Sequence, residues 1–465
     1  MSLVQYDARD EAFDFTSHFR EDFYACLTRR DGTLFELTDA MLCEDGPVTS
    51  PVDLTLLAKH RRGHGAMYDA LNQGRIDAAR LRKALAMLPQ PKAADNRLFC
   101  HVYGRSGRSS DQFIPGWPYS FVAALETRRT SWCQLLDAVR LGPDDDVAEV
   151  TAAQVRRVVT DLIGQGQWEA GDPDILVVFD AGYDAPRMAY LLTGLPVEVL
   201  GRMRSDRVAP SGALPQGVRP GLSPGRATAE ARQGVPLRQA RHLGRGRRGD
   251  RVGHDRYGTA QAMAWDRIHP RLITRSAWID HDGELPVIEG TLIRLKVDHV
   301  PGGREPLPLW LWSSKTGLTS EDVDRRWQGF LRRFDLEHTF CFEKQTLSWT
   351  RPRLRTPEAA DRWTWIVIAA HTQLRLTREA AADLRRPWEK PAEPARLTPA
   401  RVRRGFRNIC PHLHNPARAP KPSTPGPGRP LGSKNRRPTT RYDVGKTTRR
   451  PESIAERNQL KAHKP

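Results

Sequence analysis

Residues 175–200, ILVVFDAGYDAPRMAYLLTGLPVEVL, decide the fold class of this chain. Ile175–Phe179 is a short, wholly apolar run, which predicts a buried strand. Ala185–Leu192 has the composition of a helix, and Val197–Leu200 alternates like a second strand. A strand, a helix and a strand in this order form a βαβ crossover, which implies a parallel strand pair. We therefore expect an α/β fold.

Sequence patterns on both sides of this unit predict further strands of the sheet and several helices. Apolar or alternating segments predict strands at 98–103 and 119–125 and a hairpin formed by 291–300 and 307–313. The predicted helices are residues 77–88, 152–163, 320–347 and 356–376. Residues 1–95 have helical character throughout, so the chain begins with a helical region.

Charge and composition narrow the class of function. The 465 residues include 73 Lys and Arg against 55 Asp and Glu, a net charge of +18. An excess of this size favours a polyanionic partner, with nucleic acid as the first candidate. No apolar run is long enough for a membrane span, and residues 1–13 lack a signal-peptide core. With six scattered cysteines and no CxxC pair, we expect a cytoplasmic, nucleoid-associated protein.

Most of the positive charge lies in the last 70 residues. Residues 396–465 contain 18 Lys and Arg and 3 Asp and Glu, a net charge of +15. They are rich in proline and, apart from Phe406, nearly free of large apolar residues, so we expect most of them to be disordered. Pro427-Gly428-Arg429-Pro430 resembles an AT-hook, which reads the minor groove of A·T-rich DNA. The alternative is a basic tail that grips phosphates without preference. The candidate DNA contacts in the tail are Arg429, Lys434, Arg436 and Arg437.

A second biased stretch, residues 209–254, has nine Gly, nine Arg and five Pro but no Lys and no aromatic residue. This composition predicts a disordered segment. It fits an RGG-like nucleic-acid-binding loop, and it also fits a GC-rich gene read out of frame over this interval.

Two acidic residues are candidate catalytic groups. Asp180 follows the predicted strand 175–179, where open α/β sheets place their sites, while Asp184 is better placed to cap the following helix. Glu337 belongs to the pattern Phe330-x2-Arg333-x3-Glu337-x6-Lys344, whose spacing puts its members on one helical face. Such a face would flank a phosphate and a metal ion. The alternative is a solvated stripe of ion pairs.

These motifs resemble those of insertion-sequence transposases of the DDE superfamily, in the actinobacterial type of the branch with a Tyr-Arg-Glu-Lys motif. The resemblance rests on FDAGYD (179–184), the Phe-Arg-Glu-Lys pattern, IPGWPYSFVAALE (114–126), WLWSS (310–314), RRFDLEHTF (332–340) and the stretch 386–408. It implies a ribonuclease-H-like core in which two Asp and one Glu hold two Mg²⁺ or Mn²⁺ ions and cut and join DNA.

Several roles follow from the resemblance alone. Asp180 would be the second metal-binding carboxylate and Glu337 the third, with Arg333 and Lys344 on phosphates of the transposon end. Phe330 stands at the Tyr position, and Trp312 or Trp310 could stack on a flipped base, although core packing is expected of at least one of them. The implied partners are terminal inverted repeats, target DNA and a second copy of the chain.

The first carboxylate of such an enzyme has no match here. Residues 88–95 run directly into the strand at 98–103, so the first strand of the core and its Asp are expected to be missing. Two ions need all three carboxylates, so we expect a transposase copy that is inactive. The alternative is a non-catalytic DNA-binding remnant that uses the basic tail.

We expect the chain to be divided into six segments. They are a helical DNA-binding region (1–95), the first part of the catalytic domain (96–208), the Gly/Arg-rich segment (209–254), a β-rich insertion (255–319), the closing helices of the catalytic domain (320–390) and the basic tail (391–465).

Overall fold

The structure is a computed structural model of the whole chain. It describes residues 3–88, 98–103, 117–126, 130–142, 145–180, 182–203, 208–210, 234–236, 247–248, 252–254, 258–270, 272, 278, 281–299, 306–352, 354 and 356–420. None of the helices in these ranges is both long enough and apolar enough to cross a bilayer.

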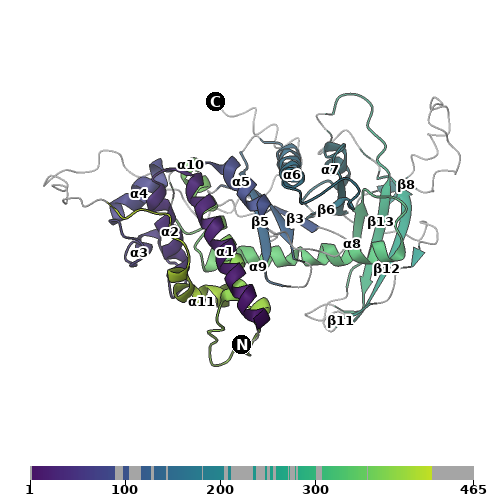
Figure 1. Cartoon of the computed structure of the whole chain (residues 1–465). Coiled ribbons are helices and arrows are strands. Elements are labelled where there is room, and N and C mark those ends of the chain that lie inside the picture. Colours follow the sequence, from purple (N-terminus) through teal and green to yellow (C-terminus); the bar gives the residue numbers. More distant parts are fainter. Residues whose placement is uncertain are drawn as a thin grey trace.

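Most of the described strands form one large mixed sheet, with helices at one end and a strand-rich extension at the other (Figure 1). Its order is β10-β12-β13-β14-β7-β6-β3-β4-β5, with β11 also paired to β12. The central strands are β3 (Leu98–Tyr103), β4 (Tyr119–Leu125), β5 (Cys133–Arg140), β6 (Ile175–Phe179) and β7 (Val197–Arg202). β3, β4 and β5 pair antiparallel, whereas β3, β6 and β7 run parallel to one another.

The predicted βαβ unit is confirmed. β6 is buried along its whole length, α7 (Ala185–Leu191) follows it, and β7 returns parallel to it. Asp184 caps α7, as expected, because its side chain accepts a hydrogen bond from the backbone N–H of Arg187. Gly201 of β7 allows α7 to pack closely, since a Cβ at this position would lie 2.6 Å from the Cβ of Ala185.

Helices cover both faces of the sheet. Alternate residues of β6 face opposite sides: Val177 and Phe179 join the cluster that includes α6 (Val147–Gly164) and α7, while Leu176 and Val178 join the cluster beneath α8 (Ser320–Arg332). Farther along the same side, α9 (Phe334–Gln345) contacts β4 and β5. The helix predicted at 320–347 is thus two helices, which meet at Arg333 (Figure 1).

A buried ion pair fixes α8 to the sheet. Arg326 of α8 donates from Nε and Nη2 to the two carboxylate oxygens of Glu198 on β7, at 2.9 and 2.6 Å. Ser313 Oγ donates to the same carboxylate at 2.6 Å. Because all three side chains are almost fully buried, this contact holds the helix at one position along the sheet.

The helical region predicted at the start of the chain forms the other end of the molecule. It contains α1 (Leu3–Cys26), α2 (Asp31–Cys43), α3 (Pro51–Leu54), α4 (His64–Gln73), α5 (Ala78–Met87) and a small ribbon of β1 (Leu27–Arg29) with β2 (Arg75–Ile76). α10 (Pro357–Leu376) packs among them, and short 3-10 turns, η4 (Arg378–Ala380) and η5 (Pro394–Arg396), follow it.

Part of the expected disordered tail is folded, which corrects its boundary. α11 (Pro399–Ile409) and η6 (Cys410–His412) pack in the same core as α1, α2 and α10. The apolar side chains that anchor them are Leu397, Val402, Phe406, Ile409 and Leu413. These few apolar residues are separated by basic and polar ones, so the average composition of the segment does not reveal the apolar face of α11. Residues 421–465 lie outside the described part of the chain.

The β-rich extension contains the predicted hairpin of β13 (Gly290–Val297) and β14 (Leu309–Ser313), next to β12 (Gly258–Ile268). Most of residues 209–254 lies outside the described residues. Within it, however, β10 (Arg247–Arg248) and β11 (Val252–His254) pair with β12, and β9 (Gly234–Pro236) pairs with β8 (Val208–Pro210). The structure therefore contradicts complete disorder of residues 209–254. Short strands form there because backbone pairing along an edge strand needs no apolar side chains.

The absence of a predicted strand before residue 96 leaves no gap in the middle of the described sheet. β3 is hydrogen-bonded to β4 on one side and to β6 on the other, so the middle of the sheet is continuous.

Candidate active site

Asp180 lies where the sheet meets the junction of α8 and α9. It follows β6 directly, at the carboxyl end of a parallel strand. Phe179 faces α7, so the next residue faces the opposite side of the sheet, toward α8. The Asp180 side chain keeps 28% of its surface exposed. Because Asp184 caps α7, the carboxylate of Asp180 is not used as a helix cap.

Arg333 is the partner of Asp180. Its Nε and Nη2 lie 3.2 and 3.1 Å from Oδ1 of Asp180, across 153 residues of sequence. The guanidinium also lies over two rings, 4.5 Å from the centroid of Phe330 and 4.6 Å from that of Phe334. Arg333 ends α8 and begins α9, so the break between the helices coincides with the contact. A guanidinium held between rings and a carboxylate has little freedom to move.

Glu337 is in the first turn of α9, one helical turn beyond Arg333. It is exposed, as is Lys344 farther along the helix, and the seven-residue spacing between them puts both on one face of α9. Nζ of Lys344 lies 5.7 Å from the ring centroids of both Phe340 and Trp349. Arg333 contacts Asp180 at the end of β6, and Glu337 lies one helical turn beyond Arg333. The end of β6 is therefore about one helical turn away from Glu337, the second candidate carboxylate.

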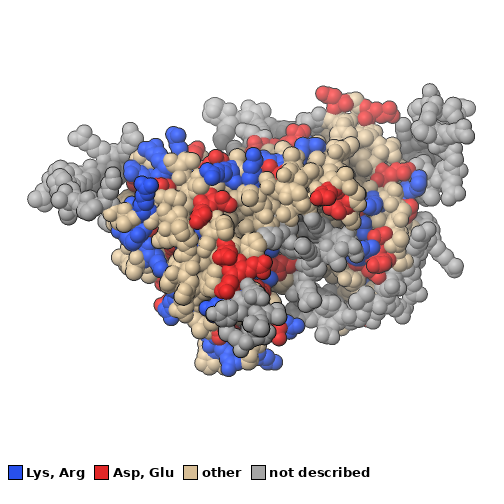
Figure 2. Space-filling model, viewed as in Figure 1, with Lys and Arg blue, Asp and Glu red and all other residues tan. Residues whose placement is uncertain are grey.

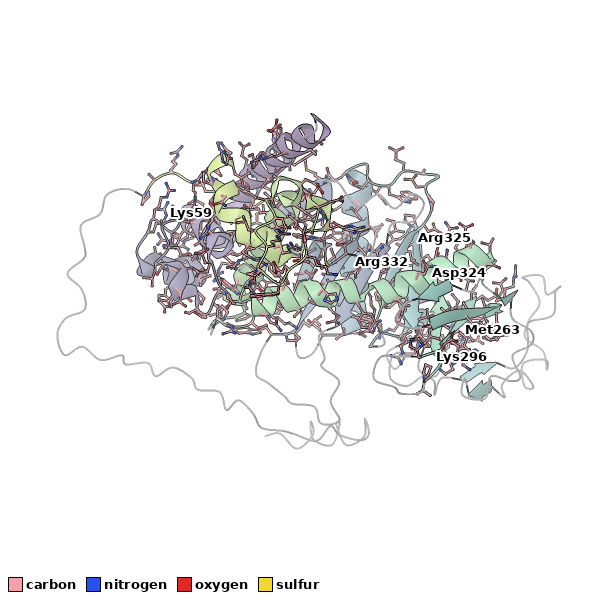
Figure 3. All side chains as sticks on the ribbon, turned by 90° about the horizontal axis from the view of Figure 1, so that it is seen from below. Lys59, Met263, Lys296, Asp324, Arg325 and Arg332 are labelled. Carbon is pink, nitrogen blue, oxygen red and sulfur yellow. The ribbon has the colours of Figure 1, made fainter. Side chains whose placement is uncertain are left out.

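The nearby acid Asp335 does not belong to this exposed face. It is buried, burial raises its pKa, and Arg332 Nη2 lies 3.2 Å from its Oδ2. Figure 3 labels Arg332 on the long α8–α9 helix. Asp335 is thus unsuited to replace a missing ligand beside Asp180.

The aromatic candidates are placed differently from expectation. Phe330 is 1% exposed and belongs to the core beneath α8, so its ring supports Arg333 and is closed to DNA. Trp312 is fully buried, and its indole N–H donates to the carbonyl oxygen of Ile268 at 3.2 Å. Trp310 is 6% exposed and stacks on Trp265. In this conformation neither tryptophan offers a face to a flipped base, because both belong to the buried core on one face of the sheet.

The residue that sequence reasoning missed is Phe334. It is 51% exposed and covers one face of the Arg333 guanidinium. Its position four residues after Phe330 was visible in the sequence, and this spacing puts both rings on the helical face that also carries Arg333.

The described residues do not offer the ligands that two divalent ions need. No cluster of three or more His, Cys, Asp or Glu side chains suited to a metal occurs among them. β3 lies beside β6 in register, with His101 opposite Phe179, so Val102 is the position next to Asp180. The sequence of β3, LFCHVY, contains no acid. Asp180 and Glu337 are two carboxylates, which is fewer than the three that a site for two ions needs.

Other candidate positions lie outside the described residues. They are the tail residues Arg429, Lys434, Arg436 and Arg437.

Basic side chains gather on the helical end of the molecule. Figure 2 shows Lys and Arg over α4, α10 and α5 in this view. The exposed basic residues that the N-terminal segments contribute are Arg29, Arg30, Arg61, Arg75, Arg80 and Lys83. Arg30 is paired with Asp69 at 2.5 Å and Arg29 bonds to Gln73, so only part of this charge is free to meet an anionic partner.

Comparison with known proteins identifies the family of the chain. Residues 22–98 and 92–271 match the family model described as DDE superfamily endonuclease, and together these segments span more than half of the chain. The two matched segments meet at residues 92–98, where the first carboxylate strand was expected to be missing. No curated protein matches the sequence.

Proposed function

Because the chain belongs to the DDE superfamily of endonucleases, we propose that it is an insertion-sequence transposase of the Tyr-Arg-Glu-Lys branch, and that this copy binds DNA without cutting it. The family match supports a transposase-like function with DNA as the substrate. The finer assignments below rest on the geometry of the described residues.

The order of the central strands supports a ribonuclease-H-like core. Three antiparallel strands come first in the chain, and two parallel strands then add on the free side of the first, giving the spatial order β5-β4-β3-β6-β7. This is the arrangement that the fold name denotes. Helices on both faces and an insertion between β7 and α8 complete the expected plan.

The observation that carries the proposal is the contact between Arg333 and Asp180. It joins the two motifs that the resemblance singled out, at the carboxyl end of a parallel strand. The side chains that would contact DNA near this point are Arg333, which holds Asp180, and Lys344, which is exposed on the same helix. Mg²⁺ or Mn²⁺ bound there would supply charge neutralisation at the phosphate.

The lack of a third carboxylate is the reason for the proposed inactivity. In the proposed core, β3 takes the place beside β6 where the first Asp of an active enzyme would stand, and β3 has no acid. We propose that the deletion removed the original first strand and that residues 98–103 now fill its position. The break in the family match at 92–98 supports a local departure at this point.

DNA binding and cleavage should be measured separately on the full chain. The substrate is a duplex cut from the DNA that flanks the gene, so that it carries the ends of the element, with Mg²⁺ or Mn²⁺ present. We expect a stable complex whose affinity falls steeply with salt, and no nicking above that of the double variant Asp180→Asn, Glu337→Gln.

A second experiment introduces an acid on β3, beside Asp180, to test the proposed cause of inactivity. Val102→Asp puts a carboxylate at the register position beside Asp180, and we expect it to raise Mn²⁺ affinity about tenfold, because a further charged ligand joins the ion. The matched control is His101→Asp, one register position earlier. Nicking by the unaltered chain would overturn the proposed inactivity, whereas failure to bind any duplex would overturn the proposed DNA partner.

A further inference from the structure

A tight turn between α10 and α11 carries an exposed tryptophan. Residues 386–389 form a β-turn, which is closed by a hydrogen bond of 3.0 Å from the backbone N–H of Glu389 to the carbonyl oxygen of Arg386. The Glu389 carboxylate also accepts a hydrogen bond from the backbone N–H of Arg386, at 2.8 Å. Pro387 and Trp388 are the central residues of the turn, and proline is favoured at the first of these positions because its ring fixes φ. Trp388 is 75% exposed, so a turn with little backbone freedom presents the indole to solvent.

Two arginines of α11 hold this turn in place. Arg404 donates from Nη1 and Nη2 to the two carboxylate oxygens of Glu389, both at 2.8 Å. Arg401 donates to the carboxylate of Asp383 and, at 3.0 Å, to the carbonyl oxygen of Lys390. These contacts lie before, within and after the turn. Because α11 is itself packed in the helical core, the turn has a fixed position on the protein surface.

The charged groups around the indole make this surface basic. Arg385, Arg386 and Lys390 are exposed. The guanidinium of Arg386 lies 5.6 Å from the centroid of the Trp388 ring. The two carboxylates of residues 383–390 are paired with arginines of α11 and are thereby neutralised. The turn therefore presents a flat apolar ring surrounded by positive charge, which suits a partner that has flat rings and negative charge.

We propose that this turn binds single-stranded DNA, with an unpaired base stacked on Trp388 and backbone phosphates on Arg385 and Lys390. The inference rests on the proposed function, in which DNA is the partner. Arg386 lies over one face of the indole, so a base would stack on the other face. Aromatic side chains stack on any base, because every base has a flat π face, and flanking cations hold the backbone. The bases of an intact duplex are already stacked on one another, so the turn would select an unpaired end or gap.

The test measures the binding of the full chain to three DNAs by fluorescence anisotropy at one salt concentration. The first is a blunt duplex, the second is the same duplex with a short unpaired extension of thymidines, and the third has an abasic extension of the same length. We expect the thymidine extension to raise affinity at least about fivefold over the abasic one, because only the former has bases to stack. The abasic extension carries the same phosphates, so it accounts for the gain due to charge alone.

Variants of the turn make the result specific. Trp388→Ala should remove the gain from the thymidines and leave the affinity for the blunt duplex unchanged. Trp388→Phe should keep part of the gain, whereas Trp388→Leu, which keeps an apolar side chain without a ring, should lose it. Leu384→Ala is the matched control, because it removes a 37% exposed apolar side chain close to the turn and should keep the gain. Since Trp388 is largely exposed, its variants should have the melting temperature of the unaltered chain.

The outcomes separate this site from the proposed function. If the unaltered chain binds none of the three DNAs, the proposed DNA partner and the stacking site both fail. Equal affinity for the thymidine and abasic extensions would overturn the stacking site alone. So would a loss in Trp388→Ala that is equal for blunt and extended duplexes, since that would place the ring on paired DNA. Dimerisation that Trp388→Ala abolishes while the gain from the thymidines persists would assign the ring to a contact between copies of the chain and would also overturn the proposal.

Discussion

Nη2 of Arg333 lies 3.1 Å from Oδ1 of Asp180, so the residue at the helix break holds the residue at the strand end. Asp180 lies at the carboxyl end of a parallel strand, and the guanidinium of Arg333 balances the charge of its carboxylate. A dication at Asp180 must compete with Arg333 for the same oxygen.

Removing the guanidinium of Arg333 should strengthen the binding of a divalent ion at Asp180. We expect Arg333→Gln to raise Mn²⁺ affinity about threefold to tenfold, because a nearby cation repels a dication and partial exposure screens the effect. Calorimetry or Mn²⁺ electron paramagnetic resonance measures the change. Lys344→Gln removes the same charge from the same helix face and should have a smaller effect. Equal gains for both variants would mean that net charge, and not the contact with Asp180, controls the ion.

The buried carboxyl of Glu343 should make the protein less stable at alkaline pH. Glu343 is 1% exposed, its Oε1 has no hydrogen-bond partner among the described residues, and burial raises its pKa to about 8 from 4.5. Between these values the unfolded chain has lost a proton that the folded chain keeps, so the free energy of unfolding falls as pH rises from about 4.5 to 8.

Replacing Glu343 tests this directly. Glu343→Leu should stabilise the protein by about 1–3 kcal/mol at pH 9 and by less at pH 5, since it removes a buried charge that forms only at high pH. Urea unfolding at the two pH values measures the difference. Glu337→Gln, an exposed site on the same helix, is the control. A stabilisation that is equal at both pH values would show that packing, not ionisation, dominates.

The buried side chain of His371 should make the protein less stable at acidic pH. It is fully buried beside Trp132 and Phe342, and burial lowers its pKa to about 3 from 6.5, with Arg375 adding to the shift. Between these values the unfolded chain binds a proton that the folded chain does not, so stability is lost as pH falls from about 6.5 to 3. The difference in unfolding free energy between the wild type and His371→Phe should vary across this range and be constant above pH 7.5.

The folded position of α11 changes what truncation should do. Removing residues 421–465 deletes 12 Lys and Arg and 3 Asp and Glu, so DNA affinity and its salt dependence should fall while the melting temperature stays unchanged. Removing residues 397–465 should also unfold the helical end, because Val402 and Phe406 are fully buried there. Fluorescence anisotropy with DNA and circular dichroism separate the two effects. Unchanged affinity in the shorter truncation would exclude the tail as a DNA contact.

The sequence by itself determined the local elements and the order of the motifs. The apolar run at 175–179 predicted β6, Asp184 was identified as a cap, and the spacing of Glu337 and Lys344 placed both on one exposed helix face. Such features depend on neighbours within a few residues, since strand and helix periods and caps are short-range. The excess of basic residues likewise needs no structure to be counted.

Only the tertiary structure decided which of these residues meet and which are closed to solvent. Trp312 is buried because β12, remote in sequence, lies against it, and Phe330 is buried because α8 packs on sheet residues such as Leu176 and Val178. α11 is folded because α2 and α10 accept its few apolar side chains, and β3 fills the middle of the sheet because β6 offers it parallel hydrogen bonds. The contact of Arg333 with Asp180 spans 153 residues. Burial and long-range pairing depend on partners that no local pattern names, which is why periodicity and composition leave them open.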